Sequence, residues 1–107
     1  MATDTLLSHS VYFTLTDNSE DAKAALVADC KQYLSDHPGT VFFSAGTLAE
    51  QYERPVNDRA FDVALHVVFE YEAAHDAYQQ APKHVEFIEK NKANWKQVRV
   101  FDALVGQ

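Results

Sequence analysis

The sequence has few of the residues that build disulfide frameworks, thiolate metal clusters or membrane spans. Its 107 residues include a single cysteine, Cys30, which excludes an internal disulfide and a zinc site made of several thiolates. No apolar run approaches the ~18 residues that a membrane-spanning helix needs. The first five residues include an acid and lack the basic region of a signal peptide, so we expect a cytoplasmic protein.

Basic residues are also scarce. Nine Lys and Arg stand against 16 Asp and Glu, and the formal net charge is −7. The electrostatic field of such a negative net charge repels duplex nucleic acid and anionic membranes. The nearest basic stretch, from Lys90 to Arg99, is spread along a predicted helix and strand and is typical of a solvated face. We therefore expect neither a nucleic-acid partner nor a membrane partner.

The overall composition and length of the chain are typical of one globular domain. Hydrophobic residues make up 47% of the chain and charged residues 23%. A domain of this size buries only about two-thirds of the surface of its unfolded chain, so association with a second copy is a favourable way to bury more. We expect a tail over residues 1–6 and a single domain over residues 7–104.

Alternation of apolar and polar residues predicts the strands. In the first, residues 7–16, one face carries Leu7, His9, Val11, Phe13 and Leu15. In the third, residues 61–70, one face carries Phe61, Val63, Leu65, Val67 and Phe69. Shorter apolar segments at 41–48 and from Val98 onward predict the second and fourth strands.

Capping residues and helical spacing predict three helices. The first follows Asp17-Asn18-Ser19 and ends at His37-Pro38-Gly39, and the second covers residues 72–78. Pro82 suits the first position of the third helix, where its missing N–H costs nothing. One face of that helix carries His84, Phe87, Ile88, Asn91 and Trp95.

The order β-α-β-β-α-α-β predicts an α+β fold with one four-stranded sheet and helices on one face, because each helix has only one apolar stripe to cover. The other sheet face would carry Tyr12, Ala64, His66 and Val68. This face is too apolar for water and too polar for a monomer core, so we expect a second copy to cover it in a homodimer.

His84 and Tyr78 are the best candidates for chemistry. His84 lies in the first turn of the Pro82 helix, where burial and the positive helix end both disfavour imidazolium. Tyr78 lies six residues earlier and offers a phenolic donor. A neutral base beside a phenol in an apolar site suits deprotonation next to a carbonyl, with the phenol holding the enolate oxygen. Alternatively, the two side chains are a buried pair that satisfy each other or a backbone carbonyl.

The other histidines are weaker candidates for a functional role. His9 lies on the apolar face of the first strand, either as an orienting group near the same cavity or as an ordinary core histidine. His66 with Glu70 suggests a polar pair at a subunit interface, and His75 beside Asp76 suggests a solvated side chain. Because the five histidines are scattered and no His-x-x-x-His pair exists, we expect no metal and no cofactor. Cys30 lies on a buried stripe and is expected to be inert.

Several segments together resemble the stress-responsive dimeric α/β-barrel domain family, over about Leu7 to Leu104. They are the strand from His9 to Asp17, the strand from Phe61 to Phe69, the block Tyr78-Gln-Gln-Ala81-Pro82-Lys-His84 and Val98-Arg-Val-Phe-Asp102. The block is the most specific piece. In the family it is Tyr-x-x-His-Pro-x-His, so Ala81 stands where a histidine neighbour of His84 is usual.

The resemblance implies a ferredoxin-like, four-stranded antiparallel sheet that packs on that of a second copy as a dimeric α+β barrel. Members of the olivetolic acid cyclase type perform an aldol cyclisation of a polyketide thioester. Their catalytic Tyr and His match Tyr78 and His84, and a first-strand histidine matches His9. Their apolar ligand-binding positions match Val11, Phe13, Leu65, Phe87 and Trp95.

These observations leave three functional hypotheses. The first is a stress-associated homodimer that binds a small hydrophobic ligand. The second is a cofactor-free lyase or cyclase for a small hydrophobic carbonyl compound, with His84 as base and Tyr78 as donor. The third is a dimer in which the residues around His84 only fill the core.

Overall fold

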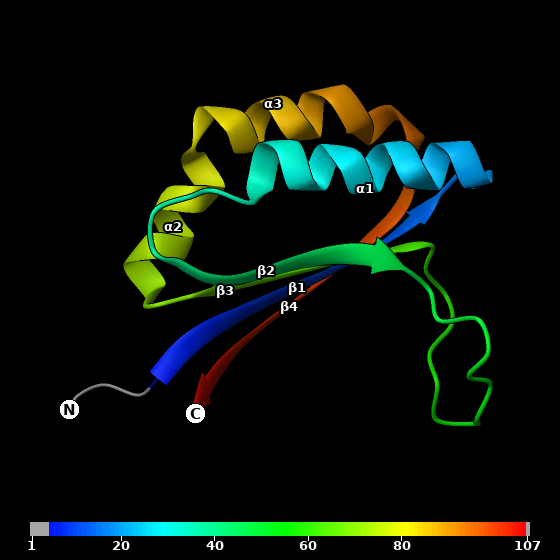
Figure 1. The fold of residues 1–107 in the computed structure, drawn as a ribbon, viewed down its shortest axis with the longest axis horizontal. Coiled ribbons are helices and arrows are strands. Elements are labelled where there is room, and N and C mark those ends of the chain that lie inside the picture. The colour runs from blue at the N-terminus through cyan, green and yellow to red at the C-terminus, as the bar shows by residue number, and fades with distance from the viewer. Residues whose placement is uncertain (1–4, 107) are drawn as a thin grey trace.

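The computed structural model describes residues 5–106, so most of the expected N-terminal tail, residues 1–4, lies outside the described residues. The elements are β1 (Thr5–Leu15), α1 (Glu20–Leu34), β2 (Thr40–Thr47), β3 (Val63–Phe69), α2 (Glu72–Gln80), α3 (Pro82–Asn91), a 3₁₀ turn (Lys92–Asn94) and β4 (Trp95–Gly106). Figure 1 shows the helices gathered on one side of the sheet. The predicted α+β fold with helices on one face is confirmed.

The four strands lie in the order β2-β3-β1-β4, and each neighbouring pair is antiparallel. The helix after β1 and the two helices after β3 each carry the chain past one strand, which is the split β-α-β plan of ferredoxin-like folds. In this register Val11 lies opposite Leu65 on β3 and Val100 on β4. The apolar sides of three strands therefore meet under the helices.

The local signals that predicted the elements are visible in the structure. Every second side chain of β1 and β3 is buried on the helix side. Ser19 caps α1, where its side-chain oxygen accepts a hydrogen bond from the Ala22 N–H (3.2 Å). Pro82 is the first residue of α3. Within the described residues, no helix combines the length and hydropathy that crossing a membrane requires.

Two local predictions are wrong. Trp95 is the first residue of β4 and not part of a helix, because α3 ends at Asn91 and a 3₁₀ turn changes the helical phase before residue 95. Phe61 does not share the buried face of β3. The strand begins only at Val63, and the Phe61 ring packs on Tyr12 on the opposite sheet face, with ring centroids 4.9 Å apart.

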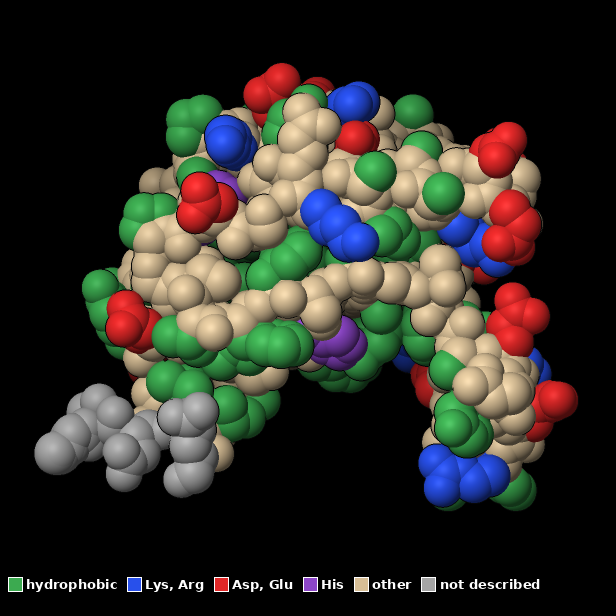
Figure 2. All heavy atoms as spheres, viewed as in Figure 1, with side chains coloured by type: hydrophobic (Ala, Val, Ile, Leu, Met, Phe, Trp, Pro, Cys, Tyr) green, Lys and Arg blue, Asp and Glu red, His purple; other side chains and the backbone are tan. Residues whose placement is uncertain are grey.

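The sheet face away from the helices is uncovered, and the 48–62 loop between β2 and β3 projects beyond it (Figure 1). Figure 2 shows the molecule hollowed on this side, with hydrophobic side chains gathered under the sheet. Phe42 on β2 and Phe101 on β4 are each about half exposed. A third aromatic residue, Tyr12, packs edge-on against Phe101. We call this uncovered surface the open face.

Gly39, in the turn between α1 and β2, is expected to tolerate no larger residue. Its φ is 84°, and a Cβ there would lie 2.4 Å from the Ala74 Cβ on α2. We expect Gly39→Ala to lower the free energy of unfolding by about 2–3 kcal/mol through strain and overpacking. Gly46→Ala is the matched control, because nothing lies within 4 Å of its added Cβ. Urea unfolding of both variants measures the difference. If Gly39→Ala were as stable as Gly46→Ala, the crowded positive-φ turn at Gly39 would be contradicted.

Candidate functional site

A cavity of about 270 Å³ lies between the sheet and the helices. Its wall includes all eight residues that the sequence proposed for a site: His9, Val11, Phe13, Leu65, Tyr78, His84, Phe87 and Trp95. Val98 and Val100 of β4 also line it and are 38% and 50% exposed. The cavity therefore opens along the β4 edge, where the helices leave the sheet uncovered. The functional roles of these residues remain predictions.

The junction of α2 and α3 brings Tyr78 and His84 together. Ala81 is extended (φ −63°, ψ 140°), so the chain leaves α2 and enters α3 without a continuous helix. The Ala81 N–H donates to the Tyr78 carbonyl, and its carbonyl accepts from the His84 N–H. The two rings consequently lie with centroids 4.7 Å apart at 61°.

Both rings present an unpaired polar atom at this point. The Tyr78 hydroxyl and His84 Nδ1 are buried, and neither has a hydrogen-bond partner among the described residues. An unpaired buried donor or acceptor costs about 1–3 kcal/mol, and native proteins contain few of them. Trp95 Nε1 is a third such atom on the same cavity wall. These atoms call for an explanation other than packing, and a polar group of a ligand supplies one for the adjacent Tyr78 and His84.

The protonation states suit a base beside a donor. Burial lowers the pKa of His84, as do the nearby His9 and His37, while the Gln79 backbone acts the other way. Burial raises the pKa of Tyr78, and the Cys30 thiol adds to the effect. At neutral pH the site therefore holds an uncharged imidazole and a protonated phenol.

Asp102 is a site residue that sequence analysis did not identify. It pairs with His9 across β4 and β1, and its Oδ1 lies 2.5 Å from His9 Nδ1. Burial lowers the pKa of His9, and the hydrogen bond to Asp102 opposes that change. The sequence feature that could have identified Asp102 is the alternation of β4, because it places Asp102 on the same face as Val98 and Val100.

The surroundings of two more histidines differ from those that the sequence predicted. The prediction that His75 is solvated is wrong, because its side chain is 14% exposed and its ring lies 5.0 Å from that of His9. His66 pairs with Ser10, at 3.1 Å, and not with Glu70.

His37 does lie in a turn, but its ring also packs edge-on against Tyr78, 4.9 Å away. Four histidines thus surround the Tyr78 region, which no spacing in the sequence indicated.

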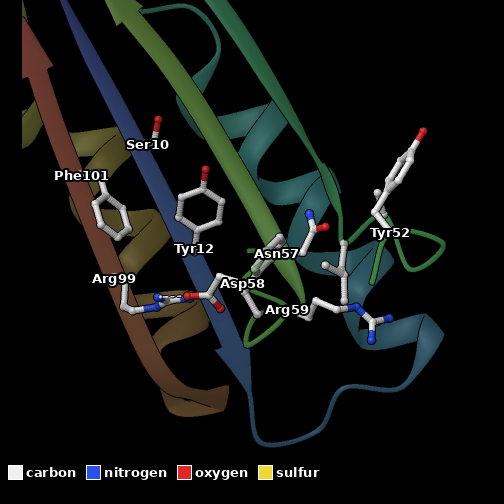
Figure 3. Close-up of a pocket in the computed structure, with 11 residues that line it drawn as sticks. Ser10, Tyr12, Tyr52, Asn57, Asp58, Arg59, Arg99 and Phe101 are labelled. Carbon is white, nitrogen blue, oxygen red and sulfur yellow. Dashed lines mark hydrogen bonds and ion pairs between the residues drawn. The ribbon is translucent and has the colours of Figure 1, made fainter. Parts of the chain in front are cut away.

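A larger hollow, of about 470 Å³, lies on the open face. Figure 3 shows Ser10 and Tyr12 on β1, Arg99 and Phe101 on β4, and the 48–62 loop closing one side. Two of its charged groups, Arg99 and Asp58, pair with each other at 2.8 Å. This hollow belongs to the uncovered sheet surface, and none of the eight proposed site residues lines it.

The lowered pKa values of His9 and His84 predict a pH dependence of stability. In the unfolded chain both groups titrate near ~6.5. A depressed folded-state pKa means that the unfolded state binds protons first as the pH falls, so stability is complete above ~6.5 and decreases below it. The expected slope is at most about 1.4 kcal/mol per pH unit for each histidine. Arg99 lowers the pKa of Asp58, so this carboxyl affects the stability only at a more acidic pH than the two histidines do.

Urea unfolding at fixed protein concentration between pH 8 and pH 5, about the window around the reference pKa, measures this slope. His84→Gln should reduce it, because one of the two titrating groups is removed. A stability that stays constant or increases on acidification from pH 7 would show that these histidines are exposed to solvent or paired with acids.

The sheet order and the cavity under the helices define a ferredoxin-like α+β protein with an enclosed side-chain cluster. The family model of the stress-responsive A/B barrel domain, Dabb, matches residues 7–105, and the chain belongs to this family. A comparison with curated protein sequences found no match.

Three solved structures illustrate the similarity. A Dabb family protein with a ferredoxin-like fold from Mesorhizobium loti superposes with a TM-score of 0.77 at 22% identity, over 96% of this chain and 99% of that one. The hydroxynitrile lyase of Passiflora edulis gives 0.77 at 18%, over 98% and 97%. A dimeric ferredoxin-like protein of unknown function from Thermobifida fusca gives 0.77 at 13%, over 98% and 95%. At these identities the likeness establishes the fold alone.

Proposed function

We propose that the chain is a homodimeric, cytoplasmic binding protein that takes a small, largely apolar ligand with a carbonyl or similar polar group. The observation that carries this proposal is the pair of unpartnered buried atoms, the Tyr78 hydroxyl and His84 Nδ1, on the wall of one apolar cavity. Apolar pockets with a few convergent polar groups are typical of small-molecule sites. The volume of about 270 Å³ lies below the usual ~300–1,000 Å³, which favours a small ligand.

The open face supports the homodimer. It exposes Phe42 and Phe101, and the partly buried Tyr12 ring packs on Phe101. Large exposed apolar patches mark interfaces. The similar proteins from Thermobifida fusca and Bacteroides fragilis are described as dimeric. Light scattering should give twice the 12.1 kDa chain mass. Phe101→Glu should shift it toward the monomer, whereas Val85→Glu on the helix layer should not. A wild-type chain that stays monomeric would refute the dimer.

The ligand site is tested with a simple carbonyl probe. Acetophenone, an aromatic ketone, should perturb NMR signals of the cavity wall, among them the Trp95 indole and the Val11 and Leu65 methyls. Val100→Trp should block this binding, because Val100 lines the open side of the cavity and is half exposed, so a larger side chain fits there without disturbing the fold. Val85→Trp is the control. Perturbation that persists unchanged in Val100→Trp would place the probe elsewhere.

A second candidate is a cofactor-free lyase or cyclase, favoured by the chemistry of the same two groups. The neutral His84 Nδ1 has a lone pair that accepts a proton from the carbon next to a bound carbonyl. The C–H electron pair then moves into the carbonyl, whose oxygen becomes an enolate and accepts a hydrogen bond from the Tyr78 hydroxyl. Return of a proton from the His84 imidazolium to the carbon completes exchange. In cyclisation the enolate carbon instead attacks a second carbonyl, and the oxygen of that carbonyl takes the proton from His84. The name of the Passiflora edulis lyase gives this candidate a precedent on the same fold.

A further inference from the structure

We propose that His9, His75 and Asp102 form a binding site for a divalent transition-metal ion of the zinc type at the mouth of the cavity. One ligand atom from each residue can be chosen so that all three atoms lie within 4.8 Å of one another. Two imidazoles and one carboxylate are a donor set that suits zinc, iron(II), cobalt or nickel better than magnesium or calcium. This site goes beyond the proposed ligand function and does not depend on it.

Three elements supply the three side chains. His9 lies on β1, Asp102 lies opposite it on β4, and His75 lies on the first half of α2, over the same end of the sheet. The atoms His9 Nδ1 and His75 Nε2 lie 2.5 Å and 3.7 Å from Asp102 Oδ1. Zinc bonds of ~2.0–2.2 Å place tetrahedral ligand atoms about 3.3 Å apart, so adjustments of about an ångström convert the hydrogen-bonded cluster into a coordination site.

The surroundings orient His75 and leave the cluster reachable. His75 Nδ1 lies 3.4 Å from the Asp76 carboxylate, the type of partner that fixes the ring of a metal-ligating histidine. Its other nitrogen, Nε2, contacts the Gln79 amide at 3.2 Å, and a bound ion displaces that contact. The Asp102 side chain is 44% exposed, so an ion has a path from solvent. The net charge of −7 favours a cation further.

The position gives the ion a connection to the cavity. His9 and Asp102 both line the cavity that Tyr78 and His84 share. Three protein ligands leave at least one coordination position for water or for an oxygen donor of a ligand, which is the arrangement of open metal sites. The sequence predicted no metal because its histidines are scattered along the chain. The fold brings residues 9, 75 and 102 together, so spacing along the chain carried no signal.

The test uses the metal alone, on full-length chain that carries no polyhistidine tag and has been stripped of metal with a chelator. Co²⁺ should produce a saturable visible absorption and large paramagnetic shifts of the His9 and His75 ring signals, while the His66 ring on the open face, which is not a ligand, shifts much less. Excess Mg²⁺ should not displace the bound Co²⁺, because imidazole donors suit the transition metal better than magnesium. In competition with Zn²⁺, His75→Ala and Asp102→Asn should each weaken the affinity by at least about tenfold. His66→Asn, a histidine removed from the other sheet face, should leave it unchanged.

Asp76→Asn keeps the proposal falsifiable should a ligand variant fail to fold, because its side chain is 76% exposed. It should weaken Zn²⁺ binding by about 10–100-fold. Absence of saturable Co²⁺ binding would overturn the proposal, as would equal shifts at His66 or affinities unchanged in His75→Ala and Asp102→Asn. None of these results bears on the ketone-binding experiment, which is performed with a chelator present and so tests the ligand cavity separately.

Discussion

Replacement of His84 by alanine is expected to abolish nearly all proton abstraction at a bound ketone. The test reaction is exchange of the methyl hydrogens of acetophenone for deuterium, followed by NMR in D₂O, because it requires only the first step of the proposed chemistry. Loss of a positioned general base should lower the rate by about 10²–10⁴-fold. The reason is that His84 Nδ1 is the unpaired basic atom beside Tyr78 on the cavity wall.

Tyr78→Phe separates the donor from the base. It should lower the exchange rate by about 10²–10³-fold, as loss of an enolate-stabilising donor does. The same variant should be as stable as wild type or more stable, because it removes a buried hydroxyl without a hydrogen-bond partner in the described structure. Val85→Ala on the exposed side of α3 is the control for both variants. Exchange that continues at the wild-type rate in His84→Ala would eliminate the enzyme candidate and leave the binding proposal intact.

Phe13→Ala is expected to cause the largest loss of stability, about 3–5 kcal/mol. Phe13 is only 2% exposed near the C-terminal end of β1, and its ring packs against Trp95 and Phe87 with centroids 5.0 Å and 6.3 Å apart. Because it borders the cavity, its removal enlarges a space that the helices cannot close. Urea unfolding measures the loss, and Val85→Ala on the exposed side of α3 should stay within about 0.5 kcal/mol of wild type. A similar small change for Phe13→Ala would mean that the core collapses around the gap.

The sheet and helices were predictable because each has a periodic signal of its own. Alternation in β1 and β3 identifies a strand and its buried face at once, since a shift by one residue would expose every apolar side chain. The position of Phe61 was not predictable in this way. The backbone is irregular before Val63, where Asp62 bonds to the β1 backbone: its N–H donates to the Phe13 carbonyl and its carboxylate accepts from the Leu15 N–H.

The candidate site was predictable only where one short segment carried it. Tyr78 and His84 are six residues apart around Pro82, so local helix geometry already indicates their proximity. Asp102 and His75 approach His9 through strand pairing and helix docking over long sequence separations, which a single sequence does not reveal. Trp95 reached the cavity wall through β4 and not through the helix that its spacing suggested, so its placement there agreed with the expectation for a different structural reason.

The single tryptophan of the chain makes the cavity spectroscopically visible. Trp95 lies on the cavity wall against Phe13 and Phe87, and its indole nitrogen is buried without a partner among the described residues. Indole emission depends on the polarity of its surroundings, and no second tryptophan elsewhere in the chain contributes a background. The protein thus carries an intrinsic fluorophore on the wall of the proposed ligand cavity, so a change in its emission can report binding there without a label.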